Sequence, residues 1–221
     1  MADITAKYKR YAVYFAPHES SSLARFGVQW LAGDDMIVSK PRRYGFHATL
    51  KAPMRLAEGV DYKKLCEQVE ILARKRAPVS LGFLKISQLS DFLALVPERS
   101  KVQGLNELAW KCVRFLDPLR APMTHNQIAR RKSLKHLERE NYDQWGYPYV
   151  GNQFRFHMTL SNSLAKYELG EARQKLDDCI GNSLIEPVTI DSLCIFGDPG
   201  NQGQFELLQR FELRGASDKA E

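Results

Sequence analysis

Two stretches of the chain decide the fold, YGFHATLK (Tyr44–Lys51) and QFRFHMTLS (Gln153–Ser161). Each contains His-x-Thr-Leu among residues that favour β-strands. Residues two apart in a strand point to the same side, so the histidine and threonine of each motif share a face. The residues between them are apolar, which predicts strands that bury one face beneath helices and present a polar face on the other side. The four polar residues are His47, Thr49, His157 and Thr159.

Chance does not readily produce this pair of motifs. The chain has five histidines, and two His-x-Thr-Leu matches arise by accident on the order of once in ten thousand such chains. The alternative interpretation is a pair of strand histidines bonded to backbone groups, with threonines present for their strand propensity. That interpretation suits one copy of the motif well and suits two copies at equivalent places poorly.

Hydrophobic periodicity outside the motifs predicts both strands and helices. Further strands are expected at Tyr11–Ala16, Val79–Ser87, Phe92–Val96, Val188–Phe196 and Phe205–Leu213. Helices are expected at Ser20–Leu31, Tyr62–Ala77, Val102–Leu116 and Glu168–Ile180. Capping residues support three of these helices, namely Asp61 and Ser100 as N-caps and Gly181 as a C-terminal stop.

These elements occur in the same order twice, which indicates an internal duplication. The repeat units are about 11–87 and 92–196, and the second unit carries an insertion at about 120–150. We therefore expect an α+β fold of two pseudo-symmetric lobes. Each lobe would be an antiparallel sheet covered by helices on its outer face, with a central groove between them. Residues 1–213 would form this single bilobal domain, followed by a solvated tail at 214–221.

Composition is ordinary for a globular protein, with 221 residues, 44% apolar residues and a net charge of +6. The positive charge favours an anionic substrate. The first residues contain no signal peptide or membrane span, so we expect a cytoplasmic protein without membrane partners. No Cys-x-x-Cys pair occurs, and no acidic cluster accompanies either histidine motif, so neither a metal nor a cofactor is expected. The cysteines, expected to be buried thiols, are Cys66, Cys112, Cys179 and Cys194.

The paired motifs suit phosphoryl chemistry at near-neutral pH. A neutral imidazole can accept a proton from an attacking water, and an imidazolium can donate one to a leaving oxygen. Threonine hydroxyls can donate hydrogen bonds to phosphate oxygens, where negative charge builds up. The duplication makes His47 and His157 near equivalents, so the sequence leaves open which is the acid and which is the base.

The insertion differs in character from the rest of the chain. Its first part predicts a basic helix that includes Arg130 and Arg131, and the aromatic run WGYPY (Trp145–Tyr149) follows. One interpretation is a solvated helix face. The other is a cap beside the site, whose arginines would meet a phosphate and whose tyrosines would meet a sugar or a base.

At the two motifs the sequence resembles the two-histidine (2H) phosphoesterase superfamily, whose members carry two His-x-Ser/Thr-x motifs on facing lobes. The segments His47–Leu50 and His157–Leu160 both match that pattern. The order of elements matches from about Tyr11 to Leu213. The resemblance implies a metal-independent cyclic phosphodiesterase or an RNA end-processing enzyme, with the two histidines as acid and base.

The surrounding segments, YGFHATLKAP (Tyr44–Pro53) and WGYPYVGNQFRFHMTL (Trp145–Leu160), resemble a bacterial branch of that superfamily often encoded with phosphonate-degradation genes. This resemblance implies a phosphoribosyl cyclic phosphate as the small phosphorylated substrate, and its second phosphate needs cations of its own. The expected substrate-binding residues are Tyr44, Lys51, Arg130, Arg131, Tyr149 and Arg155. Two alternatives are an enzyme that processes RNA ends and a non-catalytic nucleotide-binding module. The sequence makes no prediction of the oligomeric state.

Overall fold

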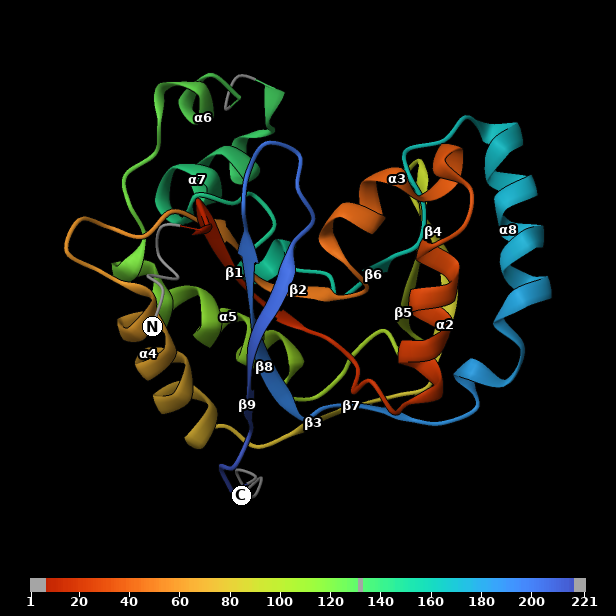
Figure 1. Cartoon of the computed structure of the whole chain (residues 1–221), viewed down its shortest axis with the longest axis horizontal. Helices are drawn as coiled ribbons and strands as arrows, with labels where there is room; N and C mark the ends of the chain where they lie inside the picture. Colours follow the sequence, from red (N-terminus) through yellow and green to blue (C-terminus); the bar gives the residue numbers. More distant parts are fainter. Residues whose placement is uncertain (1–6, 131–132, 217–221) are drawn as a thin grey trace.

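The computed structural model describes residues 7–130 and 133–216 and has an α+β fold (Figure 1). The strands are β1 (Arg10–Phe15), β2 (Ala48–Met54), β3 (Val79–Gly82), β4 (Leu84–Leu89), β5 (Phe92–Pro97), β6 (Met158–Thr159), β7 (Val188–Ile190), β8 (Ser192–Asp198) and β9 (Glu206–Glu212). The α-helices are α2 (Ser22–Leu31), α3 (Asp35–Tyr44), α4 (Tyr62–Arg74), α5 (Leu105–Leu116), α6 (His125–Arg130), α7 (His136–Trp145) and α8 (Lys166–Ile180). Across the described ranges, none of the helices is both long and apolar enough to cross a membrane.

The main sheet joins both lobes. Its strand order is β4-β5-β6-β2-β1-β8-β9, and each neighbouring pair is antiparallel. The two motif strands, β2 and β6, meet at the centre, where Ala48 lies opposite Met158. From this centre the order β2-β1-β8 on one side corresponds to β6-β5-β4 on the other. The expected α+β class with antiparallel strands is confirmed, and the two lobes share one continuous sheet.

Each lobe takes elements from both predicted repeat units. The first lobe contains β2, β1, β8 and β9 and is covered by α4 and α5, whereas the second contains β4, β5 and β6 with α2, α3 and α8 (Figure 1). Thus α5 from the second unit packs on β2, and β4 from the first unit pairs with β5. The duplication itself stays a prediction, and the fold interleaves the two units.

Two predicted strands are each divided into two. The segment 79–87 forms β3 and then β4, and 188–196 forms β7 and then β8. β3 and β7 pair with each other in a separate two-stranded sheet. Gly82, at the end of β3, has a φ of +69°, a conformation that glycine adopts without strain and that ends the strand. Hydrophobic alternation continues through such a break and does not reveal it.

Helix capping was predicted correctly for α4 and incorrectly for α5. The Asp61 side chain accepts a hydrogen bond of 2.7 Å from the Lys64 backbone N–H, as an N-cap does. The helix then buries Leu65 and Val69 in the core. Ser100 does not cap α5, because that helix begins at Leu105, after Gly104 with its φ of +77°.

The helix α3 was not predicted, and it occupies residues that lead directly to the first motif. Pro41 lies inside it, and a proline has no N–H to donate to the carbonyl four residues earlier. That carbonyl belongs to Ile37, and it accepts a 2.6 Å hydrogen bond from the backbone N–H of Asn162 instead. The backbone just after the second motif thus compensates for the proline in the helix before the first motif.

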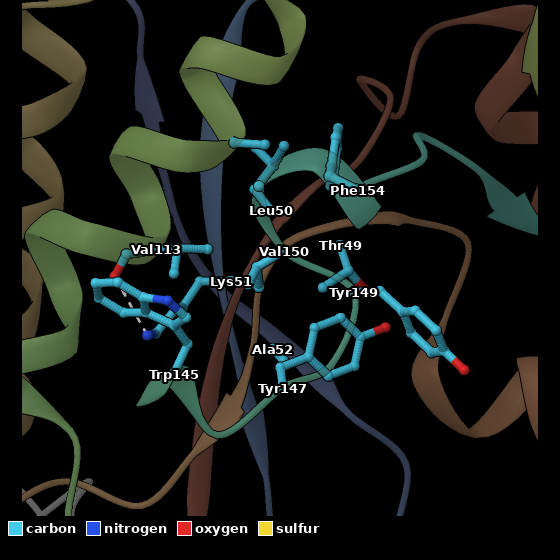
Figure 2. Close-up of a pocket in the computed structure, with 12 residues that line it drawn as sticks. Thr49, Leu50, Lys51, Ala52, Val113, Trp145, Tyr147, Tyr149, Val150 and Phe154 are labelled. Carbon is cyan, nitrogen blue, oxygen red and sulfur yellow. Dashed lines mark hydrogen bonds between the residues drawn. The ribbon is translucent and has the colours of Figure 1, made fainter. Parts of the chain in front are cut away.

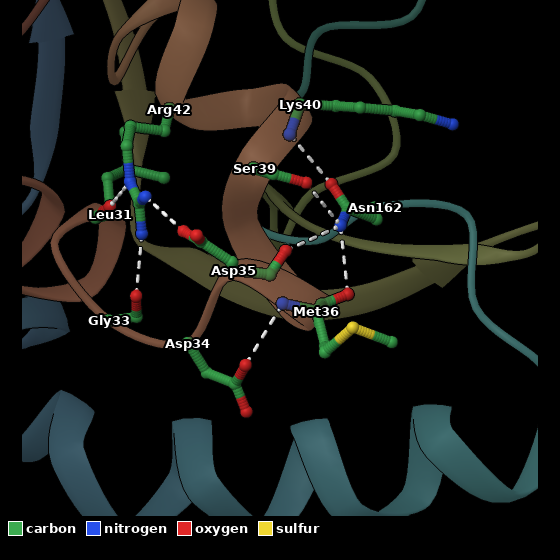
Figure 3. Close-up of polar contacts among 9 residues, drawn as sticks. All are labelled: Leu31, Gly33, Asp34, Asp35, Met36, Ser39, Lys40, Arg42 and Asn162. Atoms are coloured by element: carbon green, nitrogen blue, oxygen red, sulfur yellow. Dashed lines mark hydrogen bonds and ion pairs between the residues drawn. The ribbon is translucent and has the colours of Figure 1, made fainter.

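The Asn162 side chain strengthens this connection (Figure 3). Its Nδ2 donates to the Met36 carbonyl at 2.8 Å, and its Oδ1 accepts from the Lys40 N–H at 2.8 Å. These are the two groups that an uninterrupted helix would join to each other. The Nδ2 also lies 3.0 Å from the Ser39 hydroxyl and 3.2 Å from the Asp35 carbonyl. Asn162 therefore holds the second motif segment against α3.

Replacing Asn162 with alanine should lower the free energy of unfolding by about 1–3 kcal/mol, because several backbone groups of α3 lose a hydrogen-bond partner. Urea denaturation followed by circular dichroism measures this change. Asn152→Ala is the matched control, because Asn152 is exposed and its side chain makes no hydrogen bond within the described residues. Equal unfolding midpoints for the two variants would contradict this role of Asn162.

Candidate active site

The two motif histidines lie immediately before their strands, since β2 begins at Ala48 and β6 at Met158. The antiparallel Ala48–Met158 pair places each histidine opposite the threonine of the other motif, one residue further along. All four polar side chains therefore share one face of the sheet. The two histidines lie on a diagonal of this arrangement, for which the typical separation is about 7–8 Å. The structure thus brings His47, Thr49, His157 and Thr159 together.

Both imidazoles are oriented in the same way by the backbone. His47 Nδ1 lies 2.9 Å from the Gly45 carbonyl oxygen, and His157 Nδ1 lies 2.8 Å from that of Arg155. A carbonyl only accepts, so each Nδ1 carries the hydrogen, and Nε2 of the neutral ring has the lone pair. The Thr49 hydroxyl is 3.3 Å from His47 Nε2 and donates to it.

These Nε2 atoms are also the atoms that could ligate a metal. Over residues 7–130 and 133–216, no group of three or more histidine, cysteine, aspartate or glutamate side chains is arranged to hold a metal ion.

Burial changes the charge state of both histidines. It lowers the pKa of His47 to about 4; the hydrogen bond to the Gly45 carbonyl opposes this shift, and nearby His157 adds to it. Burial also lowers the pKa of His157, with the Arg155 carbonyl opposing. Both rings are therefore neutral near pH 7. A bound anion between them would raise both pKa values again, because it stabilises the imidazolium form.

Four aromatic rings form one side of the site, and we call them the aromatic shelf: Tyr14, Tyr44, Phe196 and Phe205. Tyr14 stacks on His47, with ring centroids 3.8 Å apart and an interplanar angle of 22°. Tyr44, an expected binding residue, has its ring centroid 6.4 Å from that of His47 and 4.9 Å from that of Phe205. Sequence reasoning missed Tyr14 and Phe205. The small residues Ala12 and Ala16 on either side of Tyr14 on its strand face were the available signal.

Lys51 was expected beside the histidines, and the structure places its ammonium elsewhere. In the β1–β2 register Thr49 lies opposite Tyr14, whereas Lys51 lies opposite Val13, so β2 carries a bulge of one extra residue. The bulge turns Lys51 to the opposite face, because strand side chains alternate. There it is only 3% exposed, and its Nζ is 2.6 Å from Asp117 Oδ1. The simple two-residue alternation does not extend past the bulge.

This ion pair gives Lys51 a structural role. Asp117 also receives two hydrogen bonds from Arg120, at 2.8 and 3.0 Å. Arg120 in turn donates to the Gln144 carbonyl near the end of α7. The chain of contacts from Lys51 through Asp117 and Arg120 thus fastens the insertion to β2.

The insertion forms two helices, α6 and α7, where one basic helix was expected. Arg130 ends α6, and its side chain, like the whole of Arg131, lies outside the described residues. The helix α7 (HLERENYDQW) carries one arginine against two glutamates and one aspartate. The described second half of the insertion is therefore acidic, although the insertion as a whole is basic in sequence.

The aromatic end of the insertion lies beside Thr49. Tyr147 and Tyr149 pack edge to face, with centroids 5.6 Å apart, and line a small pocket together with Thr49 (Figure 2). Tyr149 is half-exposed there. Arg155, another expected binding residue, is exposed, and its guanidinium makes no hydrogen bond within the described ranges. Tyr149 therefore lies beside Thr49, and the contact of Arg155 with the site is the backbone carbonyl that holds His157.

Comparison with known proteins identifies relatives of this chain. A family model described as "Protein of unknown function (DUF1045)" matches residues 49–206. The protein named ribose 1,5-bisphosphate phosphokinase PhnN from Janthinobacterium sp. (strain Marseille) is 30% identical, over 96% of this chain and 52% of the relative. The protein of the same name from Laribacter hongkongensis (strain HLHK9) is 32% identical, over 90% of this chain and 50% of the relative. The chain spans about half the length of these curated relatives.

A solved structure shares the fold. The crystal structure of E. coli LigT complexed with 3′-AMP is 14% identical, with a TM-score of 0.50, and the match covers 93% of this chain and 98% of LigT. At this identity the likeness shows the arrangement of the elements, and it agrees with the fold expected from the paired motifs.

The lowered pKa of His47 makes stability depend on pH. An unfolded histidine has a pKa near 6.5, so acidification protonates the unfolded state first. The stability contribution of the neutral, buried ring is present above pH 6.5 and is lost as the pH falls towards 4. Between pH 7 and pH 5, wild type should lose about 1–2 kcal/mol more unfolding free energy than His47→Gln. Urea titrations at both pH values measure this, with exposed His136→Gln as control. Equal acid sensitivity of wild type and His47→Gln would refute the shift.

Gly45 should be required for the orientation of His47. Its φ of +77° and ψ of 175° define a conformation that is essentially restricted to glycine and costs roughly 1–3 kcal/mol for a residue with a Cβ, so alanine there should move the carbonyl that holds Nδ1. In Gly45→Ala, the imidazole ¹⁵N shifts of His47 should change from a pure Nδ1–H tautomer to a mixture. Gly59→Ala is the matched control, since Gly59 has a φ of +75° and lies in open space away from the site. An unchanged tautomer in Gly45→Ala would disprove this role.

Proposed function

Because the chain belongs to the DUF1045 family and has the fold of the two-histidine phosphoesterases, we propose that it is a metal-independent cyclic phosphodiesterase acting on a ribose-type cyclic phosphate. The carrying observation is the equivalence of the two imidazoles. Each holds its hydrogen on Nδ1, through a carbonyl two residues earlier, and each leaves Nε2 for chemistry. A phosphorus atom on the diagonal between them would have a proton acceptor on one side and a proton donor on the other.

The reaction balances with these two groups. One Nε2 takes a proton from water as its oxygen forms a bond to phosphorus, and the ester bond to the ring oxygen breaks. The other histidine, protonated in the complex, gives its proton to the departing oxygen. The products are a phosphate monoester and a free hydroxyl. The negative charge of the bound phosphate offsets the burial that lowers both pKa values, and so favours the one imidazolium that the reaction needs.

The threonines complete the site. Thr49 and Thr159 lie on the other diagonal of the same arrangement, so their hydroxyls would face the non-bridging oxygens of that phosphate. The Thr49 hydroxyl donates to His47 Nε2 at 3.3 Å, a long contact that a substrate oxygen would replace. Preorganised donors of this kind stabilise charge that develops in the transition state.

The names of the relatives support phosphoribosyl cyclic phosphate as the substrate. The activity in those names concerns ribose 1,5-bisphosphate. If a cyclic phosphate bridges O1 and a neighbouring hydroxyl of ribose 5-phosphate, its opening at the second oxygen yields ribose 1,5-bisphosphate. An enzyme that makes this compound and a kinase that uses it would act in succession. LigT was solved with 3′-AMP, which is also a ribose phosphate.

The described second half of the insertion gives RNA less support as a substrate than a small cyclic phosphate. A strand-binding platform needs several cations along the backbone path. The described part of the insertion beyond Ser133 instead contains the acidic helix α7. A purely binding role is disfavoured because both imidazoles have an Nδ1 hydrogen bond that directs Nε2 away from the backbone, as acid–base catalysis needs.

Purified protein should open phosphoribosyl cyclic phosphate in the presence of EDTA. His47→Ala and His157→Ala should each reduce turnover by at least about a hundredfold, because each removes a proton-transfer group. His136→Ala is the matched control: this histidine is highly exposed on α7 and should leave turnover unchanged. Release of product is measured by ³¹P NMR, with 2′,3′-cyclic nucleotides and short RNAs with cyclic ends as comparison substrates.

Three results would count against the proposal. Full activity of either catalytic variant would exclude the two-histidine mechanism. Loss of activity in EDTA with recovery on adding a divalent cation would indicate a metal enzyme. A preference for RNA ends that falls steeply with salt would favour the RNA alternative.

A further inference from the structure

Two arginines converge on one buried aspartate at the edge of the aromatic shelf. Asp198 is 1% exposed, and Arg10 donates to its Oδ2 from Nε at 2.8 Å and from Nη2 at 2.5 Å. Arg43, near the end of α3, donates from Nη2 to Asp198 Oδ1 at 3.3 Å and from Nε to the Gly203 carbonyl at 3.2 Å. The three residues come from β1, β8 and α3, which the fold brings together.

This arginine pair lies on the same face of the sheet as the histidines. Along β1, Arg10 and Tyr14 are separated by four residues and so point to the same side. The register of β1 and β8 agrees, because Arg10 lies opposite Asp198 and Tyr14 lies opposite Cys194. Tyr14 stacks on His47. Arg10 is therefore further along the strand face that carries the reacting groups.

One aromatic ring separates the arginine pair from the catalytic histidine. The Arg43 guanidinium carbon is 5.5 Å from the Tyr44 ring centroid, and that centroid is 6.4 Å from the His47 ring. Both guanidinium carbons also lie near the Phe205 ring, at 6.0 Å for Arg10 and 5.8 Å for Arg43. A ligand as large as one phosphorylated sugar would reach from the histidines to the arginines across the shelf.

The cluster of Arg10, Arg43 and Asp198 carries more positive than negative charge. Two guanidinium groups share a single carboxylate, so a net positive charge remains. The Nη1 atoms of Arg10 and Arg43 make no hydrogen bond in the described part of the chain, and the side chains are 34% and 28% exposed. Asp198 holds the two planar groups in place and leaves donors for an incoming anion. Arginine suits such a role because its fixed donors match the oxygens of a phosphate.

We propose that Arg10 and Arg43 bind a second, non-reacting phosphomonoester of the substrate, at the far end of the aromatic shelf from His47. The inference rests on the proposed cyclic phosphodiesterase function and names its substrate class, a sugar that carries a terminal phosphate besides the cyclic one. The arginine pair takes the phosphate-binding role that was expected of Lys51. The Lys51 ammonium is instead paired with Asp117 on the opposite face of the sheet.

The test compares one cyclic phosphate in two forms, phosphoribosyl cyclic phosphate and the same ribose cyclic phosphate without its 5-phosphate. Arg43→Met should raise the KM for the phosphorylated form at least tenfold and change kcat little, because the arginine contacts a remote group. For the form without the 5-phosphate, KM should change less than twofold. Arg43 is the variant of choice because Asp198 keeps its two hydrogen bonds from Arg10.

Two further variants separate binding from structure. Arg173→Met is the matched control, because Arg173 also pairs with a carboxylate, Asp177, but on α8 in the other lobe. It should leave KM unchanged for both substrates. Arg43→Lys should recover part of the affinity, since it restores the charge without the planar donors. Thermal melting of each variant reports whether the fold is kept.

A measurement without turnover keeps this proposal distinct from the proposed function. Ribose 5-phosphate is titrated calorimetrically into wild type and Arg43→Met, where the expected result is at least tenfold weaker binding to the variant. Equal binding to both proteins, or an equal KM change for both substrates, would overturn the phosphate site and leave the arginines as structural ties. If no cyclic phosphate is opened while ribose 5-phosphate binding still depends on Arg43, the proposed function fails and the phosphate site stands.

Discussion

The backbone pairing of Ala48 with Met158 is the contact on which the site depends. β6 has only two residues, yet it lies between β2 and β5 and joins the two lobes into one sheet. Met158 is completely buried, so its side chain fixes which face of the strand turns inward. A slip of one residue in this pairing would send the histidines and threonines of one motif to the opposite face. The register at this pair therefore sets both the arrangement of the candidate catalytic residues and the continuity of the fold.

The two histidines reach equivalent geometry by different routes. His47 follows a helix, α3, through Gly45 with its positive φ, whereas His157 follows a short 3-10 helix (Gly151–Gln153) and an extended segment. In both cases the ring bonds to the carbonyl two residues earlier. This hydrogen bond joins residues only two positions apart, so it forms whether a helix or an extended segment precedes the histidine. Asn162 connects the two segments, because its side chain bonds to the backbone of α3.

The sequence predicted those features of the fold that depend on residues close together in the chain. The motifs, the α+β class and the main helices follow from alternation, periodicity and caps such as Asp61. Lys51 was misplaced because a one-residue bulge in β2 leaves no trace in hydrophobic alternation. The helix α3 was missed because it is polar and contains Pro41, two properties that argue against a helix in isolation. Its hydrogen-bond partner, Asn162, is distant in sequence, and so is Asp198 from Arg10. A single sequence does not predict either of these long-range contacts.

The strand neighbours of the motifs show where the two halves of the site differ. Thr49 lies opposite Tyr14 on β1, and Thr159 lies opposite Ala94 on β5, so the alanine occupies the place that corresponds to the tyrosine. His47 therefore has a ring stacked at 3.8 Å, whereas the aromatic neighbour of His157 is Phe92 at 5.8 Å. The shelf and the arginine pair both belong to the half with Tyr14. Since the hydrogen bonds of the two imidazoles are alike, acid–base chemistry does not require this difference. We infer that the half of the site with Tyr14 holds the part of the substrate that does not react. The insertion, which is attached to β2 through Lys51, borders the site on the other side of Thr49.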